Sequence, residues 1–399
     1  MSQRYYSLDV FRGATVALMI LVNNPGSWSY AFSPLKHAPW HGCTATDLVF
    51  PFFLFAVGNA MAFVMPRLMD AGTHIFWRKI VKRTILIFLI GLLLNWYPFV
   101  QWTDEILVFK YWVNPTDAES GIRIFGVLQR IALCYGIASI IVYFLKPKSV
   151  IIVSGLILLI YWFVCVLFGG VDPYSLKGWF GTAIDEKILG IAHMYKGEGV
   201  AFEPEGIIST FTAVVQVIIG YLVGNYIVKY GKGFASGKEK QHTYRVISTL
   251  AVVAALLTLA GLTWGLVFPI NKKIWTSSYV LYTSGLAITT LSVLIWFIEA
   301  KQMKNGFTKF FDVFGKNPLF IFVMSALIPK TLSLIRINNG QNAEGKILYT
   351  SPLRWFYTEV CAKFPGPPEV GSFIYAICFL TSLWLICYIM DKRNIYVKV

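Results

Sequence analysis

Two histidines and an aspartate near the N-terminus have the side chains best suited to acid–base chemistry. His37 and His41 are four residues apart, and Asp47 follows His37 by ten residues, at the start of an apolar run. An imidazole takes up a proton readily near neutral pH, and a nearby carboxylate can fix its tautomer. The pattern is typical of a histidine base oriented by a carboxylate. The structural alternative is two interfacial histidines beside an aromatic belt, with Asp47 as a helix cap.

Ionisable residues within apolar runs are the second kind of candidate, because a charge inside a membrane is costly and usually functional. Arg123 and Arg130 are seven residues apart, a spacing that predicts one helix face with Arg130 about 10 Å further in. They are interpreted as an anion or phosphate site, or as partners of Asp47. The alternative is a snorkelling or structural ion pair.

Two further polar residues stand at the edges of apolar runs. Glu205 follows Pro204 just before a run, so it is either a helix N-terminal acid or a group that holds a cationic substrate. Asn317 precedes Pro318 inside another run, where it is either a polar residue of the same cavity or part of the packed core.

Membrane-spanning helices are the elements predicted to position these residues. The 399 residues are 56% hydrophobic and 14% charged, and mean hydropathy is +0.62, whereas soluble domains carry about 25% charged residues. This composition excludes both a soluble globular protein and a disordered chain. About 20 mostly apolar residues cross the hydrocarbon core as a helix. The runs that qualify are 8–22, 48–65, 85–96 with its flanks, 124–145, 150–168, 207–228, 246–268, 279–298, 311–328 and 373–390.

The fold class is therefore predicted to be all-α. We expect a polytopic membrane bundle of about ten transmembrane helices, forming one domain over residues 1–399. An eleventh helix would be added if the short aromatic segment 353–361, within the unassigned stretch 331–370, entered the membrane. The first run is not followed by a signal cleavage site, so we expect it to be retained.

The basic residues predict how the bundle is oriented, because cytoplasmic loops carry an excess of lysine and arginine. Alternate loops and the C-terminal tail hold most of them, whereas loops 98–122 and 169–206 hold few. Both termini are thus predicted to be cytoplasmic and the His37 segment external, and the net charge of +15 is attributed to these loops rather than to nucleic-acid binding. The residues counted are Arg67, Arg78, Lys79, Lys82, Arg83, Lys229, Lys232, Lys238, Lys240, Arg245, Lys301, Lys304, Lys309, Lys392, Arg393 and Lys398.

No pattern in the chain indicates a metal site or a disulfide framework. Four of the six cysteines lie in apolar runs, and no CxxC or histidine-rich spacing occurs. The glycine-rich nucleotide motifs, a nucleophile elbow and a clear internal repeat are absent as well.

Short motifs along nearly the whole chain resemble those of the heparan-α-glucosaminide N-acetyltransferase family. The ordered set is more specific than any single motif. In chain order they are LDVFRG at 8–13, VN at 22–23, KHAPW at 36–40, TDLVFP at 46–51, RIFGVLQR at 123–130, FEPEGI at 202–207 and PINKKIWTSSY at 269–279.

The resemblance implies an acetyltransferase that takes acetyl from cytosolic acetyl-CoA and delivers it to the amine of a terminal glucosamine across the membrane. His37 stands at the position of the family's active-site histidine, and Asn23 matches an asparagine held close to it. These roles imply that His37 removes the amine proton and that Asn23 donates to the developing oxyanion. Asp47 would orient the imidazole. Direct transfer is favoured over a covalent acetyl-histidine.

Other residues are expected to bind the sugar or the coenzyme, whose pantetheine arm should thread into the bundle while basic side chains hold its phosphates. The predicted topology puts the two arginines nearer the outer half than a cytosolic nucleotide requires, so the phosphate ligands stay open. The resemblance also suggests a homodimer. The candidate binding residues are Arg123, Gln129, Arg130, Glu205, Asn317, Trp40 and His41.

The chain also departs from the family pattern. The segment between Asn23 and His37 is longer than expected, and His41 stands where the lysosomal enzyme has asparagine. The long N-terminal region of the eukaryotic enzyme is missing, which suggests a bacterial member in the inner (plasma) membrane. Its acceptor would then be free glucosamine, a muropeptide or another envelope amino sugar. The competing functions are an amino-sugar transporter and an O-acetyltransferase acting on an envelope glycan.

Overall fold

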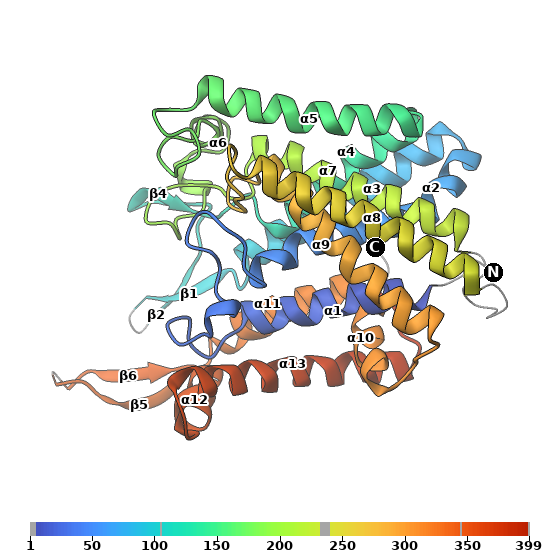
Figure 1. The fold of residues 1–399 in the computed structure, drawn as a ribbon. Helices are drawn as coiled ribbons and strands as arrows, with labels where there is room; N and C mark the ends of the chain where they lie inside the picture. The colour runs from blue at the N-terminus through green and yellow to red at the C-terminus, as the bar shows by residue number, and fades with distance from the viewer. Residues whose placement is uncertain (1–4, 104–105, 232–239, 344, 398–399) are drawn as a thin grey trace.

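The computed structural model describes residues 5–103, 106–231, 240–343 and 345–397. In these residues the protein is a bundle of long helices that run along one another, with short strand pairs at one end (Figure 1). The predicted all-α class is confirmed. The long helices are α1 (Tyr6–Asn23), α2 (Val49–Ala71), α3 (Thr73–Trp96), α4 (Val127–Phe144), α5 (Pro147–Phe168), α7 (Ile207–Tyr230), α8 (Lys240–Trp264), α9 (Ser277–Ile295), α11 (Pro318–Leu332) and α13 (Pro368–Lys392).

The number of spans is slightly lower than predicted. Among the described residues, eight helices are long and apolar enough to cross a membrane, or nine if one bent pair counts as a span. The remaining predicted run, 85–96, is the apolar end of α3, whose first half carries four basic residues. The aromatic segment 353–361 adds no span, because most of it lies in the eight-residue helix α12 (Pro352–Glu359). These helices are those of a multi-pass membrane protein.

The run 311–328, predicted as one span, is broken. Helices α10 (Gly306–Lys316) and α11 meet at an angle of 81°. The cause is Pro318, which has no N–H and disfavours the helical conformation in the residue before it. Asn317 accordingly leaves the helical region, with φ of −129° and ψ of 48°.

Helices α1 and α7 form the centre of the bundle, and α5 and α8 form its outside. The buried share of the spanning window is 67% in α1 and 72% in α7, against 28% in α5 and 22% in α8. Because the outer helices expose leucine, isoleucine and valine side chains rather than polar ones, their free faces fit contact with lipid.

Three antiparallel strand pairs lie at one end of the bundle (Figure 1). These are β1 (Val100–Thr103) with β2 (Ile106–Phe109), β3 (Val113–Asn114) with β4 (Asp117–Gly121), and β5 (Ile337–Gln341) with β6 (Ile347–Thr350). Helix α1 begins and α13 ends at the opposite end. Three of the basic residues counted above, Lys232, Lys238 and Lys398, lie outside the described residues.

Candidate active site

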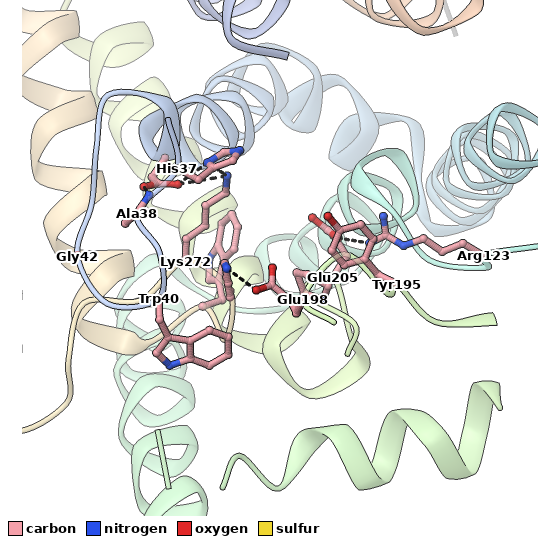
Figure 2. Close-up of a pocket in the computed structure, with 13 residues that line it drawn as sticks. His37, Ala38, Trp40, Gly42, Arg123, Tyr195, Glu198, Glu205 and Lys272 are labelled. Atoms are coloured by element: carbon pink, nitrogen blue, oxygen red, sulfur yellow. Dashed lines mark hydrogen bonds and ion pairs between the residues drawn. The ribbon is translucent and has the colours of Figure 1, made fainter. Parts of the chain in front are cut away.

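His37 and Asp47 are in contact within the segment that joins α1 to α2. This segment lies at the end of the bundle that carries the strand pairs (Figure 1), and Figure 2 shows His37 in it. His37 Nδ1 lies 2.6 Å from Oδ1 of Asp47, whose side chain is only 2% exposed, against 41% for His37. A buried carboxylate at Nδ1 favours the tautomer that carries its proton there. Nε2 is then the nitrogen that can accept a proton from a substrate.

The second carboxylate oxygen of Asp47 fastens the same segment. Oδ2 accepts hydrogen bonds from the backbone N–H groups of Ala38 and Thr44 and from the Thr44 hydroxyl, each at 3.0 Å. Asp47 itself lies in the 3₁₀-helix η2 (Thr46–Leu48), and its carboxylate makes no capping bond to α2. The alternative role as a helix cap is therefore not the one that the structure gives it.

Lys272 is the third side chain of this cluster. It lies between α8 and α9, and its Nζ is 3.1 Å from His37 Nδ1 and 3.5 Å from Asp47 Oδ1. Burial lowers the pKa of Lys272, while the nearby carboxylates of Asp47 and Glu205 oppose that shift. Sequence reasoning did not select this residue, although it lies inside the motif at 269–279.

A cavity of about 210 Å³, called here the site cavity, opens beside these three residues (Figure 2). Its wall includes aromatic rings, carboxylates and cations. The lining residues are His37, Ala38, Trp40, Gly42, Asp47, Arg123, Tyr195, Glu198, Pro204, Glu205, Lys272, Lys273 and Trp275.

Arg123 joins two carboxylates on one wall of the site cavity. Its Nε donates to Glu203 at 2.9 Å, and its Nη2 bonds both Glu203 and Glu205. Although burial opposes the charged form, the carboxylates of Glu205 and Glu203 hold the pKa of Arg123 above its ordinary value. Although burial also favours the neutral acid, Arg123, Arg130 and Lys272 hold the pKa of Glu205 below its ordinary value.

The predicted pairing of Arg123 and Arg130 on one helix face is wrong. Helix α4 begins at Val127, so Arg123 lies in the loop before it. Arg130 is fully buried and donates to the Gly206 carbonyl at 3.2 Å and to Ser209. In the structure both arginines bind the segment around the start of α7 rather than Asp47.

Other candidate residues serve the walls of the site. Trp40 lines the site cavity, and its indole N–H donates to the Tyr174 carbonyl at 2.7 Å. The His41 ring contacts the Asn271 amide at 3.3 Å, and burial lowers its pKa. Gln129 donates to the Ile124 carbonyl at 2.8 Å, which holds the turn that precedes α4.

Asn317 lies elsewhere. Its amide accepts from the Val397 N–H at 2.8 Å and donates to the Ile395 carbonyl at 3.1 Å. The side chain therefore fixes the end of the chain against the α10–α11 bend and is not among the residues that line the described cavities.

A second cavity of about 170 Å³, the inner cavity, lies on the other side of His37. It shares His37, Glu205 and Lys272 with the site cavity, and Asn23, Thr46 and apolar side chains complete it. A third, the distal cavity, of about 100 Å³, shares Phe53 and Ile131 with the inner one. The distal cavity also has Arg12 and Arg83 in its wall.

The site includes residues that sequence reasoning missed. Tyr195 and Glu198 come from the long segment between α6 (Gly181–Leu189) and α7, which has no apolar periodicity to mark them. Glu198 binds Lys273 at 2.6 Å, and the Tyr195 ring lies under the Arg123 guanidinium at 4.8 Å. Among the described residues, no three His, Cys, Asp or Glu side chains come together as metal ligands would.

Comparison with known proteins identifies the family. Residues 4–252, more than half of the chain, match the model for heparan-alpha-glucosaminide N-acetyltransferase, catalytic. The human protein named heparan-alpha-glucosaminide N-acetyltransferase is 26% identical over 370 residues, covering 80% of this chain and 52% of the human one. The mouse protein of that name is 26% identical over 454 aligned positions, covering 100% of this chain and 61% of the relative. The chain thus spans less than two thirds of these relatives. It belongs to the heparan-alpha-glucosaminide N-acetyltransferase family.

Proposed function

We propose that the protein is a transmembrane N-acetyltransferase that moves acetyl from cytosolic acetyl-CoA to the amine of a glucosamine or terminal glucosaminide on the other side. The observation that carries the proposal is the His37–Asp47 pair, which stands where the site and inner cavities meet. A base at the junction of two cavities can serve a donor that arrives from one of them and an acceptor that arrives from the other. Family membership supports the acetyl chemistry.

In the proposed reaction the amine nitrogen attacks the thioester carbonyl carbon, and the carbonyl π electrons move to oxygen. His37 Nε2 takes the amine proton, with Asp47 holding Nδ1–H. Asn23, in the wall of the inner cavity beside His37, donates to the oxyanion. The intermediate then collapses, the C–S bond breaks, and the CoA sulfur leaves with the proton from His37. Two cavities that meet at His37 favour this direct transfer over a covalent acetyl-histidine.

The inner and distal cavities are proposed to hold the pantetheine arm of acetyl-CoA. Their shared residues, Phe53 and Ile131, are apolar, which suits a chain of methylene and amide groups. Arg12 and Arg83 at the distal cavity are then placed to bind the coenzyme's phosphates. Arg123 and Arg130 fit this role less well, because both bind the segment near the start of α7. Arg12 is itself paired with Asp9 at 2.5 Å, so Arg83 is the stronger of the two candidates.

The site cavity is proposed to bind the amino sugar. Trp40 and Tyr195 offer ring faces for a pyranose, and Glu198 and Glu205 offer acceptors for its hydroxyls or amine. The excess of basic residues at the opposite end supports an external site. A bacterial plasma membrane and an envelope amino sugar stay predictions from the resemblance, as does a homodimer.

The test is acetyl transfer from labelled acetyl-CoA to glucosamine by the purified protein in detergent or liposomes. We expect N-acetylglucosamine from the wild type and its loss in a folded His37→Ala variant. The matched control is His74→Ala, since His74 is exposed at the start of α3, away from the site cavity; it should retain transfer.

Each other outcome has a definite meaning. If labelled sugar accumulates inside liposomes without being acetylated, the protein is an amino-sugar transporter and not an acetyltransferase. Transfer to a glycan hydroxyl but not to an amine would make the protein an O-acetyltransferase. If both the wild type and His37→Ala form product, the protein is an acetyltransferase but His37 is not its base. Label on the His37 peptide in the absence of acceptor would favour the covalent route.

A further inference from the structure

Lys272 occupies a position that no acid–base scheme with His37 and Asp47 alone explains. Its Nζ is 3.1 Å from His37 Nδ1 and 3.5 Å from Asp47 Oδ1, the same oxygen that lies 2.6 Å from that ring nitrogen. One carboxylate oxygen is thus shared by an imidazole and an ammonium. The Lys272 side chain is 22% exposed, so water screens the charges of this cluster less than it would at the surface.

The two neighbours of Nδ1 act on His37 with opposite signs. An anion beside an imidazole stabilises its protonated form, and a cation destabilises it. An uncompensated Asp47 would stabilise the protonated imidazole relative to the neutral one, which reduces the share of His37 that can act as a base. With Lys272 beside it, most of the carboxylate's charge is compensated, while the hydrogen bond that fixes the tautomer stays in place.

We propose that Lys272 is a positioning residue that keeps His37 uncharged and its proton on Nδ1, so that Nε2 is available as the base. An ammonium has only donors, so it cannot accept the Nδ1 proton. In this tautomer Lys272 acts through its charge, by the ion pair with Asp47 Oδ1 at 3.5 Å. The catalytic use of a neutral His37 rests on the proposed function. The effect on the imidazole, however, is a property of the protein alone.

The other charged groups around His37 do not replace this role. Glu205 lines both cavities together with His37, but the Glu205 carboxylate is bonded to Arg123 at 2.5 Å. Cys43 is close to Asp47 and Lys272, and burial raises the pKa of its thiol to about 12, so it is neutral. Lys273 points away, to Glu198 at 2.6 Å and to the Pro39 carbonyl at 2.8 Å. Among the described residues that line the inner cavity, Lys272 is the only cation.

The experiment measures the protonation of His37 without any substrate. Diethyl pyrocarbonate modifies a histidine only when its imidazole is neutral, and His37 is accessible, with 41% of its side chain exposed. The modification rate of the His37 peptide is followed by mass spectrometry between pH 5 and pH 9 in the wild type, Lys272→Met, Lys272→Arg and Lys273→Met. Elution from a gel-filtration column checks that each variant is folded.

We expect the midpoint of the His37 rate to rise by about one pH unit or more in Lys272→Met. Lys272→Arg, which keeps the charge, should restore it, and Lys273→Met should leave it unchanged. An unchanged midpoint in folded Lys272→Met would overturn the proposal whether or not the protein is an acetyltransferase. Where transfer is observed, the acid limb of the kcat profile should move in the same direction. A fall in kcat without a shift of the acid limb would mean that Lys272 supports the structure of the site and does not set the protonation of His37.

Discussion

At the scale of single residues, the two oxygens of Asp47 have different partners, and this difference can be tested. Oδ1 faces His37 and Lys272, and Oδ2 binds the loop N–H groups. Asp47→Asn keeps the shape but turns one oxygen into a donor, so either the His37 tautomer or the loop bonds must be lost. We expect kcat to fall by at least about 100-fold, with KM for the sugar changed little.

Steady-state kinetics with both substrates checks this expectation. Asp117→Asn is the matched control, because Asp117 lies on β4 at the same end of the bundle. The hydrogen bond that its carboxylate makes among the described residues is within its own turn, from the Glu119 N–H at 3.1 Å. A kcat for Asp47→Asn within a few-fold of the wild type would mean that the carboxylate serves the loop and not the imidazole.

At the scale of elements, the start of α7 is held by a second buried acid. Asp185 of α6 is fully buried and accepts the Ile207 N–H at 2.9 Å, and Gly206 passes so close to its carboxylate that a Cβ there would overlap it. The same turn positions Glu205 and receives Arg130 through the Gly206 carbonyl. The geometry of the site cavity therefore depends on how α6 packs against α7.

This contact predicts a pH-dependent stability. Burial raises the pKa of Asp185 from 3.8 to about 6. Because the folded state then holds the proton more tightly than the unfolded state, the contribution of Asp185 to stability is present below about pH 4 and is lost as the pH rises to about 6. Above that pH the ionised acid costs about 3 kcal/mol.

In thermal melts between pH 4.5 and pH 7.5, Asp185→Asn should lose part of this dependence and melt at a higher temperature than the wild type at pH 7.5. Glu186→Gln, which changes the exposed neighbour on the same helix, is the control and should behave as the wild type does. If the melting temperatures of Asp185→Asn and the wild type change with pH in parallel, ionisation of Asp185 does not destabilise the folded protein.

The helices themselves were well predicted from the sequence, whereas a break in one helix and a loop before another were not. Apolar runs mark helices that face lipid or the core, and their positions were predicted because the membrane requires length and low charge. The break at Pro318 was missed because a hydropathy window averages over it. Arg123 was placed on a helix because spacing alone cannot tell a helical turn from the loop before it, and Lys272 was missed because its partners, His37 and Asp47, lie more than 220 residues away.

At the scale of the whole molecule, the three cavities follow one another through shared lining residues, from the His37 end of the bundle to about the middle of α3. His37 stands at one end of this series and Arg83 at the other. The Arg83 guanidinium lies over the Tyr135 ring at 4.7 Å, and its buried Nε has no hydrogen-bond partner among the described residues. An unsatisfied buried donor in a cavity wall favours an anionic ligand there.

The series predicts that the two substrates arrive from opposite sides. In proteoliposomes of fixed orientation, acetyl-CoA should be used only from the side that carries the basic loops, and glucosamine only from the other. Arg83→Met should raise KM for acetyl-CoA by about tenfold to a hundredfold, the range expected for a lost charged hydrogen bond, and leave KM for glucosamine unchanged. Arg78→Met, an exposed arginine one turn earlier on α3, is the matched control. Equal use of acetyl-CoA from both sides would mean that the donor reaches His37 through the site cavity, and the roles proposed for the inner and distal cavities would fall with it.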